Sequence, residues 1–587
     1  MRRWPIVLVL SACLGVGAVP LADAHSSGNA TGIDECDWAS FRNGPLNHGA
    51  SGCDQIGVTN VATLRPHLLY RTRDSVTSTP AVVDGILYVG AWDGTFYAFD
   101  THDPGVGDPS FEGNPLVSVE PLWTFEVDDA NSVSFGRIVS SPTITDIAGT
   151  RVVIFAGGAT VYALDAATGV PLAKLCLDPR SDAATTGGRC SGSEGDVEVE
   201  SSPVVVPIDD GSVGIVIGQD NHNRAGLGRT GIVRMTLAKT MVGQVVSWTM
   251  TPVWKFDPEA GVAYSGSDML THLSGTGDGC AGVWGTPAVD VEDDVVVFGT
   301  SSCNTNGVNP ADVAGEKVFA VKYTTGEQLW RFDPSRPWGS RTDGDFGASP
   351  QLFEIDGALV AGAGGKDGWY YALDAQTGVA RWSTQVGQPG HVTPGLAIGG
   401  VLGSPAVGVA HGRTAVFVTT AISTPIGKPM DESSFFPPSS DSIDDSLAAD
   451  PGRMLSLHAL DAETGTTLWR SPLTRQTYGH PTYANGVVLV TSTVGFDVEA
   501  LHADTGVPLW RSVPLNGAPS SGVAVTNDGV YVGSGTRQTD LGFKLVGDDS
   551  VFPDPLQDLV RATPLVEYLG ADPQERASGV WGFRLAR

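Results

Sequence analysis

Short stretches of alternating apolar and polar residues recur along the chain, and most open with the same three-residue signature. The signature is typically Ser or Gly, any residue, then Pro, as in STPAVVDGILYVG and GTPAVDVEDDVVVFGT. Alternation over a few residues predicts short β-strands, and the Gly-containing dipeptides between them predict tight turns. Eight such openings occur, around Pro80, Pro142, Pro203, Pro287, Pro350, Pro405, Pro481 and Ser521.

A second element follows each opening, and its clearest copies are YYALDAQTG and LHALDAETG. The Thr-Gly turn that ends it is commonly followed by a strand with a Trp, at Trp330, Trp382, Trp469 and Trp510. Each unit therefore corresponds to four short antiparallel strands, which cannot bury both faces alone and must stack on neighbouring units. The pattern predicts an all-β fold, an eight-bladed β-propeller of four-stranded antiparallel blades, with the Trp side chains packing blade against blade.

The ends of the repeat pattern predict the domain boundaries. The last unit, GVWGFRLAR, lacks a fourth strand, so we expect LRPHLLYRT near the N-terminus to supply it and close the ring. Residues 25–60 are then an N-terminal extension with two cysteines, and residues 61–587 form the propeller. Inserts interrupt the repeats at 101–120, 178–200, 240–275 and 425–453. The last insert is rich in Pro, Ser and Asp, and we expect it to be mobile.

The N-terminus MRRWPIVLVLSACLGVGAVPLADAHSS has the basic, apolar and small-residue regions of a secretory signal peptide, which predicts residues 1–24 as the signal and an exported protein. Lipidation of Cys13 within LSAC is the alternative. Without Cys13 an even number of cysteines remains, which favours disulfides in an exported chain. Pairing of sequence neighbours would join Cys36 to Cys53, Cys176 to Cys190, and Cys280 to Cys303, although other connectivities are possible. No later apolar segment is long enough to span a membrane.

Composition supports the strand-and-turn pattern and excludes one class of partner. The chain of 587 residues has 75 Gly and 38 Pro, which suits many turns. It has 65 acidic against 35 basic residues, a net charge of −30. Nucleic-acid binding needs basic surface to displace counterions, so we expect no nucleic-acid partner.

Lys366 departs from the repeat pattern, because equivalent positions in other copies hold Trp92, Gly157 and Val494. Propeller strands alternate in direction, so the loop before a blade's first strand and the loop between its second and third strands share one face. Asp345, which precedes an opening, is therefore expected on the same face as Lys366.

Arg137 and Trp284 precede other openings and are expected on the same rim as that pair. A cation, a carboxylate, a guanidinium and an indole around a funnel suit a planar anionic ligand. The alternative is that Lys366 and Asp345 form only a structural ion pair.

The segments KDGWYYALD, GDFGASP, VWGTPAVD and FGRIVSSP resemble the cofactor-binding segments of quinoprotein alcohol dehydrogenases, eight-bladed propellers that bind pyrroloquinoline quinone (PQQ). The resemblance covers about residues 36–587, and the opening DWASFRNGPLNHGA is most similar to the polyvinyl-alcohol dehydrogenase branch. The resemblance implies that Lys366 contacts the quinone oxygens and that Asp345 is the catalytic base, with Asp343 as the alternative. It also implies that Trp284 stacks under the cofactor and that Arg137 binds a cofactor carboxylate.

The same resemblance implies a Ca²⁺ ion with Asp345 among its ligands. The family's Gly-Thr-Gly-Asn metal segment is replaced by FGTSSCN, so Ser302 or Asn304 would substitute for its asparagine. Asp220 or Asn221 would substitute for its glutamate. The family's adjacent Cys-Cys pair is absent, since NSVSF stands there. No Cys-x-x-Cys-His motif occurs, so a separate acceptor such as a cytochrome c would take the electrons.

The resemblance implies an exported dehydrogenase that oxidises an alcohol by hydride transfer to PQQ, with Asp345 abstracting a proton and Lys366 and Ca²⁺ polarising the quinone carbonyl. A non-catalytic propeller that acts as a binding or assembly scaffold in the cell envelope is the alternative. His391 and His480 lie in loops expected on the same face, where they either contact substrate or are ordinary loop histidines with satisfied hydrogen bonds.

Overall fold

The structure is a computed structural model, and it describes residues 33–103, 106–107, 117–128, 136–177, 190, 197–220, 230–266, 269, 280–302, 314–334, 344–387, 400–420, 456–472, 477, 479–492, 497–513, 515, 517, 519, 521–535 and 578–586.

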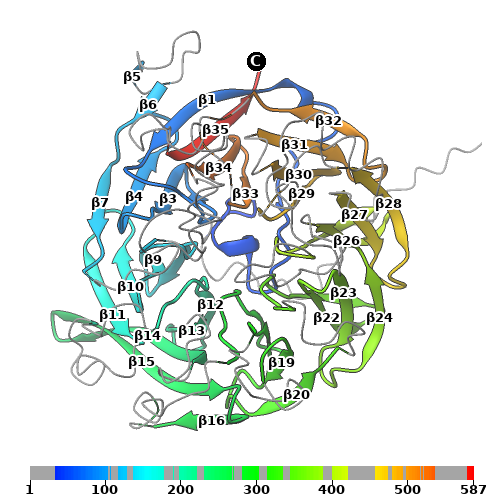
Figure 1. Ribbon diagram of the computed structural model, residues 1–587. Coiled ribbons are helices and arrows are strands. Elements are labelled where there is room, and N and C mark those ends of the chain that lie inside the picture. The colour runs from blue at the N-terminus through cyan, green and yellow to red at the C-terminus, as the bar shows by residue number, and fades with distance from the viewer. Residues whose placement is uncertain are drawn as a thin grey trace, which may run out of the picture.

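Eight sheets, antiparallel except where β1 (Leu64–Arg71) pairs in parallel with β6 (Val117–Val119), stand around a central axis, so the predicted eight-bladed propeller is confirmed (Figure 1). The first four blades comprise β2 (Ala81–Val83), β3 (Ile86–Gly90), β4 (Thr95–Asp100) and β7 (Trp123–Glu126); β8 (Thr143–Ile147), β9 (Thr150–Gly157), β10 (Thr160–Asp165) and β11 (Pro171–Cys176); β12 (Val204–Pro207), β13 (Val213–Gln219), β14 (Gly231–Val242), β15 (Val245–Asp257) and β16 (Val262–Ser265); and β17 (Ala288–Asp290), β18 (Val295–Gly299), β19 (Val318–Val321) and β20 (Gln328–Phe332).

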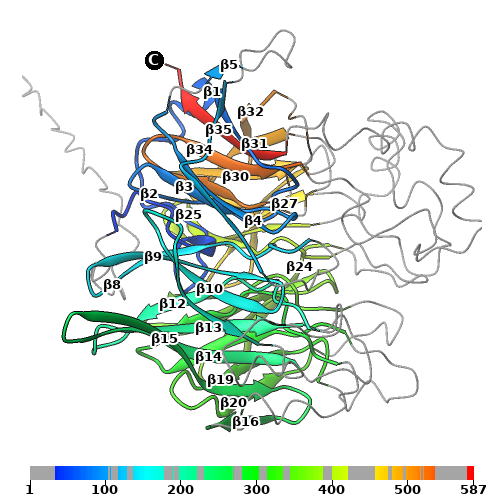
Figure 2. The ribbon, with the colours of Figure 1, turned by 90° about the vertical axis from the view of Figure 1, so that its left-hand side faces the viewer.

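The last four blades complete the ring. Figure 2 shows the ring from the side, with strands of the second and third blades toward the viewer. The last four blades comprise β21 (Gln351–Ile355), β22 (Ala358–Gly364), β23 (Trp369–Asp374) and β24 (Ala380–Gln385); β25 (Ala406–Ala410), β26 (Arg413–Thr419), β27 (Ser456–Asp461) and β28 (Thr467–Pro472); β29 (Thr482–Ala484), β30 (Val487–Ser492), β31 (Asp497–His502) and β32 (Pro508–Arg511); and β33 (Val523–Val525), β34 (Val530–Ser534), β35 (Gly579–Leu585), β1 (Leu64–Arg71), β6 (Val117–Val119) and β5 (Val106–Gly107). Two single-turn 3-10 helices, η1 (Phe41–Asn43) and η2 (Val61–Thr63), lie in the N-terminal segment.

The ring closes through β1, as the missing fourth strand of the last unit predicted. β1 pairs antiparallel with β35, from Leu64 opposite Leu585 to Arg71 opposite Gly579. The short strands β6 and β5 extend this sheet further outward. The N-terminal and C-terminal parts of the chain thus share one blade, which leaves no open seam in the ring.

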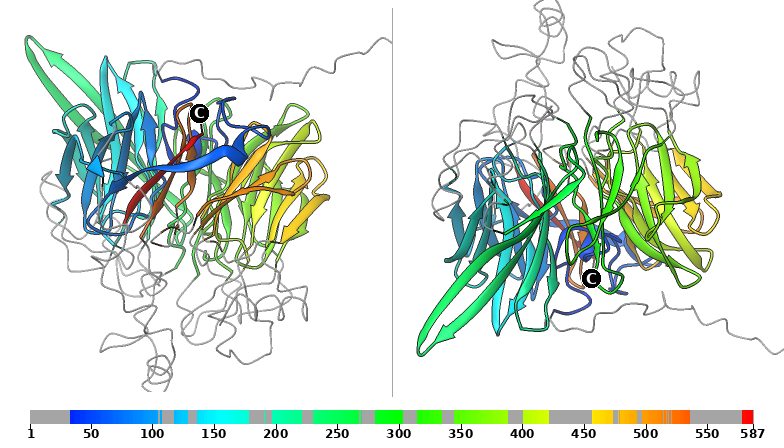
Figure 3. Two further views of the ribbon diagram at one scale, coloured as in Figure 1. Left: turned by 90° about the horizontal axis from the view of Figure 1, so that it is seen from above. Right: turned by 90° about the horizontal axis from the view of Figure 1, so that it is seen from below.

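The third blade differs from the expected four strands. Its β14 and β15 form a long hairpin that projects beyond the ring (Figure 3), and β16 adds a fifth strand. The insert predicted over 240–275 is therefore partly built of strands, because residues 240–242, 245–257 and 262–265 belong to the sheet. The connection between β14 and β15 lacks the Thr-Gly turn that marks most other units, so the repeat pattern did not reveal β15 and β16.

The recurring Trp side chains join neighbouring blades, as predicted. Trp330 ends the fourth blade, and its Nε1 donates a hydrogen bond of 2.8 Å to the carbonyl oxygen of Ala375 in the fifth blade. Its ring covers Gly378 of the next Thr-Gly turn, where a Cβ would lie 2.6 Å from the indole. Equivalent bonds from Nε1 are made by Trp123, Trp254, Trp382, Trp469 and Trp510.

The residue before each opening proline links its blade to a neighbour near the axis. In blades 1 to 5 the backbone N–H of this residue donates to the side-chain hydroxyl of the equivalent residue in the next blade. The residues of this chain of hydrogen bonds, each donating to the next, are Thr79, Ser141, Ser202, Thr286, Ser349 and Ser404. Blade 6 donates to His480 Nδ1 instead, at 2.7 Å, and Gly522 of blade 8 donates to the hydroxyl of blade 1. This near-continuous ring of hydrogen bonds explains why Ser or Thr so often precedes the proline.

The N-terminal segment 38–51 lies at the centre of the ring of blades, in blue in Figure 1. It hydrogen-bonds in turn to the innermost strands of most blades, beginning with Trp38 on Val82 and ending with Ser51 on Tyr483 and Val525. Further backbone bonds join it to Ile144, Val289, Leu352 and Val407. The residues expected to form an extension are therefore the hub of the propeller.

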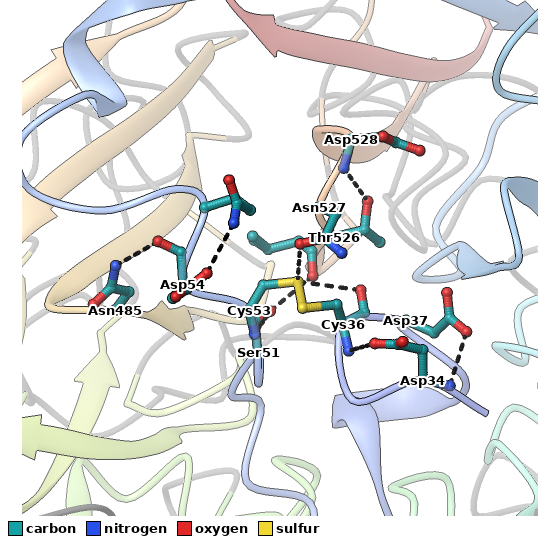
Figure 4. Close-up of a disulfide and its surroundings, with 12 residues drawn as sticks. Asp34, Cys36, Asp37, Ser51, Cys53, Asp54, Asn485, Thr526, Asn527 and Asp528 are labelled. Carbon is teal, nitrogen blue, oxygen red and sulfur yellow. Dashed lines mark hydrogen bonds between the residues drawn. A yellow bond between two sulfur atoms is a disulfide. The ribbon is translucent and has the colours of Figure 1, made fainter. Parts of the chain in front are cut away.

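A disulfide between Cys36 and Cys53 closes this segment into a loop (Figure 4). A second disulfide joins Cys176 to Cys190, so both predicted pairings are confirmed. Cys280 is also disulfide-bonded, while its expected partner Cys303 lies outside the described residues, as does the insert 425–453. No helix in the described ranges is long and apolar enough to cross a membrane.

Candidate functional site

Asp345 and Lys366 form an ion pair in the fifth blade. Asp345 lies in the loop before β21, and Lys366 lies between β22 and β23, so the predicted shared face is correct. Lys366 Nζ is 2.9 Å from Asp345 Oδ2, and the two side chains are only 12% and 8% exposed. The backbone N–H of Lys366 also donates to the Asp345 carbonyl oxygen at 2.9 Å. The two loops are thus joined through both main chain and side chains.

The turn after Lys366 holds its loop in place. Asp367 is fully buried, and it accepts hydrogen bonds from the Tyr371 hydroxyl at 2.7 Å and the Trp369 N–H at 3.0 Å. Gly368 has a φ of 85°, a conformation that glycine adopts without steric cost. The Lys-Asp-Gly sequence therefore forms a tight, internally bonded turn that presents the lysine.

The fourth blade supplies a further contact to the ion pair. The other carboxylate oxygen of Asp345 accepts a hydrogen bond from the backbone N–H of Ser302. Ser302 was a predicted metal ligand, and the structure instead shows its main chain bonded to the carboxylate. Asp345 is thus held by groups from two neighbouring blades.

Trp284 is half-buried beside this pair. Lys366 Nζ lies 5.5 Å from the centroid of its ring, within the range of a cation–π interaction. The ring packs against Gly347, where a Cβ would lie 1.6 Å from the indole. A glycine in GDFGASP is therefore required for the ring to lie in this place. Three predicted residues, Trp284, Asp345 and Lys366, come together.

Asp220 and Glu198 form a second acidic feature, in the third blade. They pair through two backbone hydrogen bonds of 3.0 Å, and both are almost fully buried. Asp220 Oδ1 lies against Gly282 of the fourth blade, close to Ser301 Oγ. The sequence identified Asp220 but gave Glu198 no role, although its place five residues before Pro203 matches that of Asp345 before Pro350.

Arg137 is not part of this cluster. Its side chain is exposed, packs against Gly94 and makes no hydrogen bond or ion pair to another described residue. Its backbone N–H donates to the carbonyl oxygen of Trp92 at 2.9 Å, which places it between the first and second blades.

The remaining predicted residues divide into two groups. Asp343, Asn221, Asn304 and His391 lie outside the described residues. His480 lies in the axial ring of hydrogen bonds, where Nδ1 accepts from the Ser404 N–H and the ring edge packs on Phe41. Of the two alternatives given by the sequence, substrate contact or an ordinary loop histidine with satisfied hydrogen bonds, the structure supports the second for His480.

The three clustered residues fit a planar anionic cofactor better than they fit a metal ion. A half-buried indole on a glycine, with a lysine beside it, provides a flat surface and a positive charge. Both oxygens of Asp345 already have partners, in Lys366 and Ser302. Within the described part of the chain, no three His, Cys, Asp or Glu side chains gather closely enough to hold a metal ion. We therefore derive no step through Ca²⁺.

Comparison with solved structures finds the same fold. The chain is similar to a europium-containing methanol dehydrogenase, at 18% identity and a TM-score of 0.60, over 94% of this chain and 98% of the other. It is also similar to the quinohemoprotein alcohol dehydrogenase ADHIIG from Pseudomonas putida HK5, at 16% identity and 0.59, over 94% and 80%. For the quinohemoprotein alcohol dehydrogenase from Comamonas testosteroni the values are 18% and 0.53, over 85% and 76%. Identities this low establish the fold alone. No curated protein matches the chain.

Two family models match the sequence. Residues 445–538 match that of the outer membrane protein assembly factor BamB. Residues 38–388, more than half of the chain, match the model of the glucose/ethanol/alcohol dehydrogenase β-propeller domain. That range includes Trp284, Asp345 and Lys366 together with the hub. The chain therefore belongs to the glucose/ethanol/alcohol dehydrogenase β-propeller family.

Proposed function

We propose that the protein is an exported quinoprotein dehydrogenase that oxidises an alcohol and passes the electrons to a separate acceptor such as a cytochrome c. The observation that carries the proposal is the cluster of Asp345, Lys366 and Trp284 at the junction of the fourth and fifth blades. Family membership supports the reaction class, and the predicted signal peptide and the two disulfides support export. The polyvinyl-alcohol branch stays a prediction about the substrate.

In the proposed chemistry each clustered residue would have its own part. PQQ, when bound, supplies a quinone that accepts hydride from the alcohol carbon. Asp345, whose Oδ2 lies 2.9 Å from Lys366 Nζ, would be the base that accepts the alcohol hydroxyl proton. Lys366 would bring its positive charge and its ammonium donors to an anionic ligand. Trp284 offers its ring as a stacking surface.

The test measures cofactor binding first and turnover second. Purified protein is titrated with PQQ, with and without Ca²⁺, and dye reduction is then followed with primary, secondary and polymeric alcohols. We expect Lys366→Ala and Trp284→Ala each to weaken PQQ binding about tenfold or more, the effect of losing one contact to a charged group. Lys174→Ala is the matched control, because Lys174 is ion-paired with Asp128 at 2.6 Å in the second blade, away from the cluster.

Far-UV circular dichroism of each variant shows whether it has folded. Absence of PQQ binding in the folded wild type would refute the proposal. Unchanged binding in both site variants would refute the assigned site.

A non-catalytic scaffold is the second candidate function. The BamB match over residues 445–538 favours it, because the described residues in this range belong to blades six to eight, and such repeats occur in assembly factors as well as in enzymes. The scaffold predicts that wild type binds no PQQ and that Lys366→Ala changes stability only.

A further inference from the structure

Asn47 joins the fourth blade to the fifth at the axis. It lies in the hub segment and is fully buried. Its side-chain amide donates hydrogen bonds to the carbonyl oxygens of Thr286 at 3.3 Å, Pro287 at 2.9 Å and Pro350 at 3.0 Å. The first two carbonyls belong to the fourth blade and the third to the fifth. One side chain thus spans the boundary between two blades.

These carbonyl groups lie on the segments that carry the candidate site. Thr286 follows Trp284 by two residues, and Pro350 follows Asp345 by five. The Trp284 ring already touches Gly347 of the fifth blade. A change in the spacing of the two blades at this point would therefore move the indole relative to the carboxylate.

The backbone around Asn47 is anchored to the same two blades. The Val289 N–H donates to the Pro45 carbonyl oxygen at 2.8 Å, and the Leu352 N–H donates to that of Leu46 at 3.0 Å. Asn47 itself has a φ of 59°, a left-handed conformation that Asn adopts more readily than most residues. The backbone that carries the Asn47 amide is thus fixed to both blades.

We propose that Asn47 is a positioning residue of the candidate site, whose amide sets the distance between Trp284 on the fourth blade and Asp345 and Lys366 on the fifth. The consequence for PQQ binding rests on the proposed function. The positioning of the indole is a property of the protein alone, so the two can be tested separately.

Asn43 provides a matched control within the same segment. It has nearly the same φ, 56°. Its amide donates to the Ala50 carbonyl oxygen at 3.0 Å, and its Oδ1 accepts from the Ala39 N–H at 3.3 Å, so both bonds stay inside the hub segment. Replacing either Asn with Gly tolerates the positive φ and removes the side-chain bonds without adding a charge.

The experiment compares wild type, Asn47→Gly and Asn43→Gly, each labelled with fluorotryptophan, by fluorine NMR without cofactor. Trp284→Phe identifies the Trp284 resonance. We expect this resonance to shift or broaden in Asn47→Gly and to stay in place in Asn43→Gly. We also expect the dissociation constant for PQQ to rise about tenfold in Asn47→Gly and less than about threefold in Asn43→Gly.

An unmoved Trp284 resonance in Asn47→Gly, or an equal change in both variants, overturns the inference regardless of PQQ. A shifted resonance with unchanged PQQ affinity overturns the role in binding. If the resonance shifts but wild type binds no PQQ, the positioning stands and the proposed function fails. Should Asn47→Gly not fold, Asn47→Ser, whose hydroxyl keeps one donor, replaces it under the same criteria.

Discussion

The charge of Lys366 is held where water is largely excluded, and its ion pair with Asp345 has a desolvation cost that offsets much of the attraction. A pair of this kind contributes little net stability, whereas removing one partner leaves an uncompensated buried charge. The contacts with Ser302 and Trp284 limit the side chains to one arrangement. A pair fixed in this way is suited to binding a ligand, which is the reason to test Lys366 through binding and stability together.

His480 makes a prediction at the same scale. Burial and the nearby Arg42 guanidinium lower the pKa of His480 from 6.5 to about 3. Between these values the unfolded chain binds a proton that the folded protein does not, so the free energy of unfolding falls as the pH falls from 6.5 towards 3. His480→Asn keeps an acceptor for the Ser404 N–H but cannot titrate. Between pH 7 and pH 4.5 the free energy of unfolding should therefore fall by about 2 kcal/mol less in His480→Asn than in wild type.

Urea unfolding at the two pH values measures this difference. His458, whose pKa burial lowers to about 4, and the carboxylates titrate in both proteins, so their effects cancel in the comparison. Equal acid destabilisation of wild type and His480→Asn would mean that His480 is already protonated in the folded protein.

At the scale of the element, the Thr-Gly turn and the Trp of the preceding blade form one packing unit. Gly378 has a φ of 69°, and a Cβ there would lie 2.6 Å from Trp330. Gly357, in another turn of the same blade, has a φ of 74° and open space around it. We expect Gly357→Ala to cost about 1 kcal/mol, from backbone conformation alone. Gly378→Ala should cost about 1–3 kcal/mol more, because the indole must move.

Urea unfolding of the two variants isolates the contact between blades, since the backbone cost is common to both. Nearly equal losses of stability would mean that Trp330 shifts without penalty and that its hydrogen bond to Ala375 is dispensable.

The blades could be predicted from the sequence because each strand and turn carries a local signal. The repeat also placed Asp345 and Lys366 on one face, since their loops occupy fixed positions in the unit. β15 and β16 were missed because their blade has lost the Thr-Gly turn. Glu198 occupies the same place before its proline as Asp345, but its pairing with Asp220 joins two separate loops and could not be predicted from that spacing.

At the scale of the whole molecule, the hub could not be predicted. Residues 38–51 occur once, so no repeat marks them, and their bonds reach far along the chain. Asn47 bonds to a residue 239 positions away, and Arg42 donates to Pro405, 363 positions away. Contacts of this kind depend on the finished ring, which places distant strands around one axis. The same contacts make the hub the part of the molecule on which several blades depend together.

The Cys36–Cys53 disulfide should therefore have an effect beyond its own loop. It closes a separation of 17 residues, and Cys176–Cys190 closes one of 14. On loop entropy alone, replacing either pair by serine should cost about 3 kcal/mol. The hub adds a specific expectation, because the backbone N–H groups of Val289, Leu352 and Tyr483 donate to its carbonyls. Once the hub is untied at its ends, these amides should exchange with solvent about tenfold faster, as local opening becomes easier.

Hydrogen exchange followed by mass spectrometry resolves peptides that contain β17, β21 and β29, the strands that carry these amides. In the variant lacking Cys176–Cys190 the same peptides should exchange as in wild type, because that disulfide joins the end of β11 to Cys190, away from the axis. If the two variants lose the same stability and neither accelerates exchange in the innermost strands, the disulfide fastens only its own loop. Acceleration confined to the Cys36–Cys53 variant would instead show that the covalent loop closed by this disulfide, at the centre of the ring, restrains blades that contribute no cysteine to it.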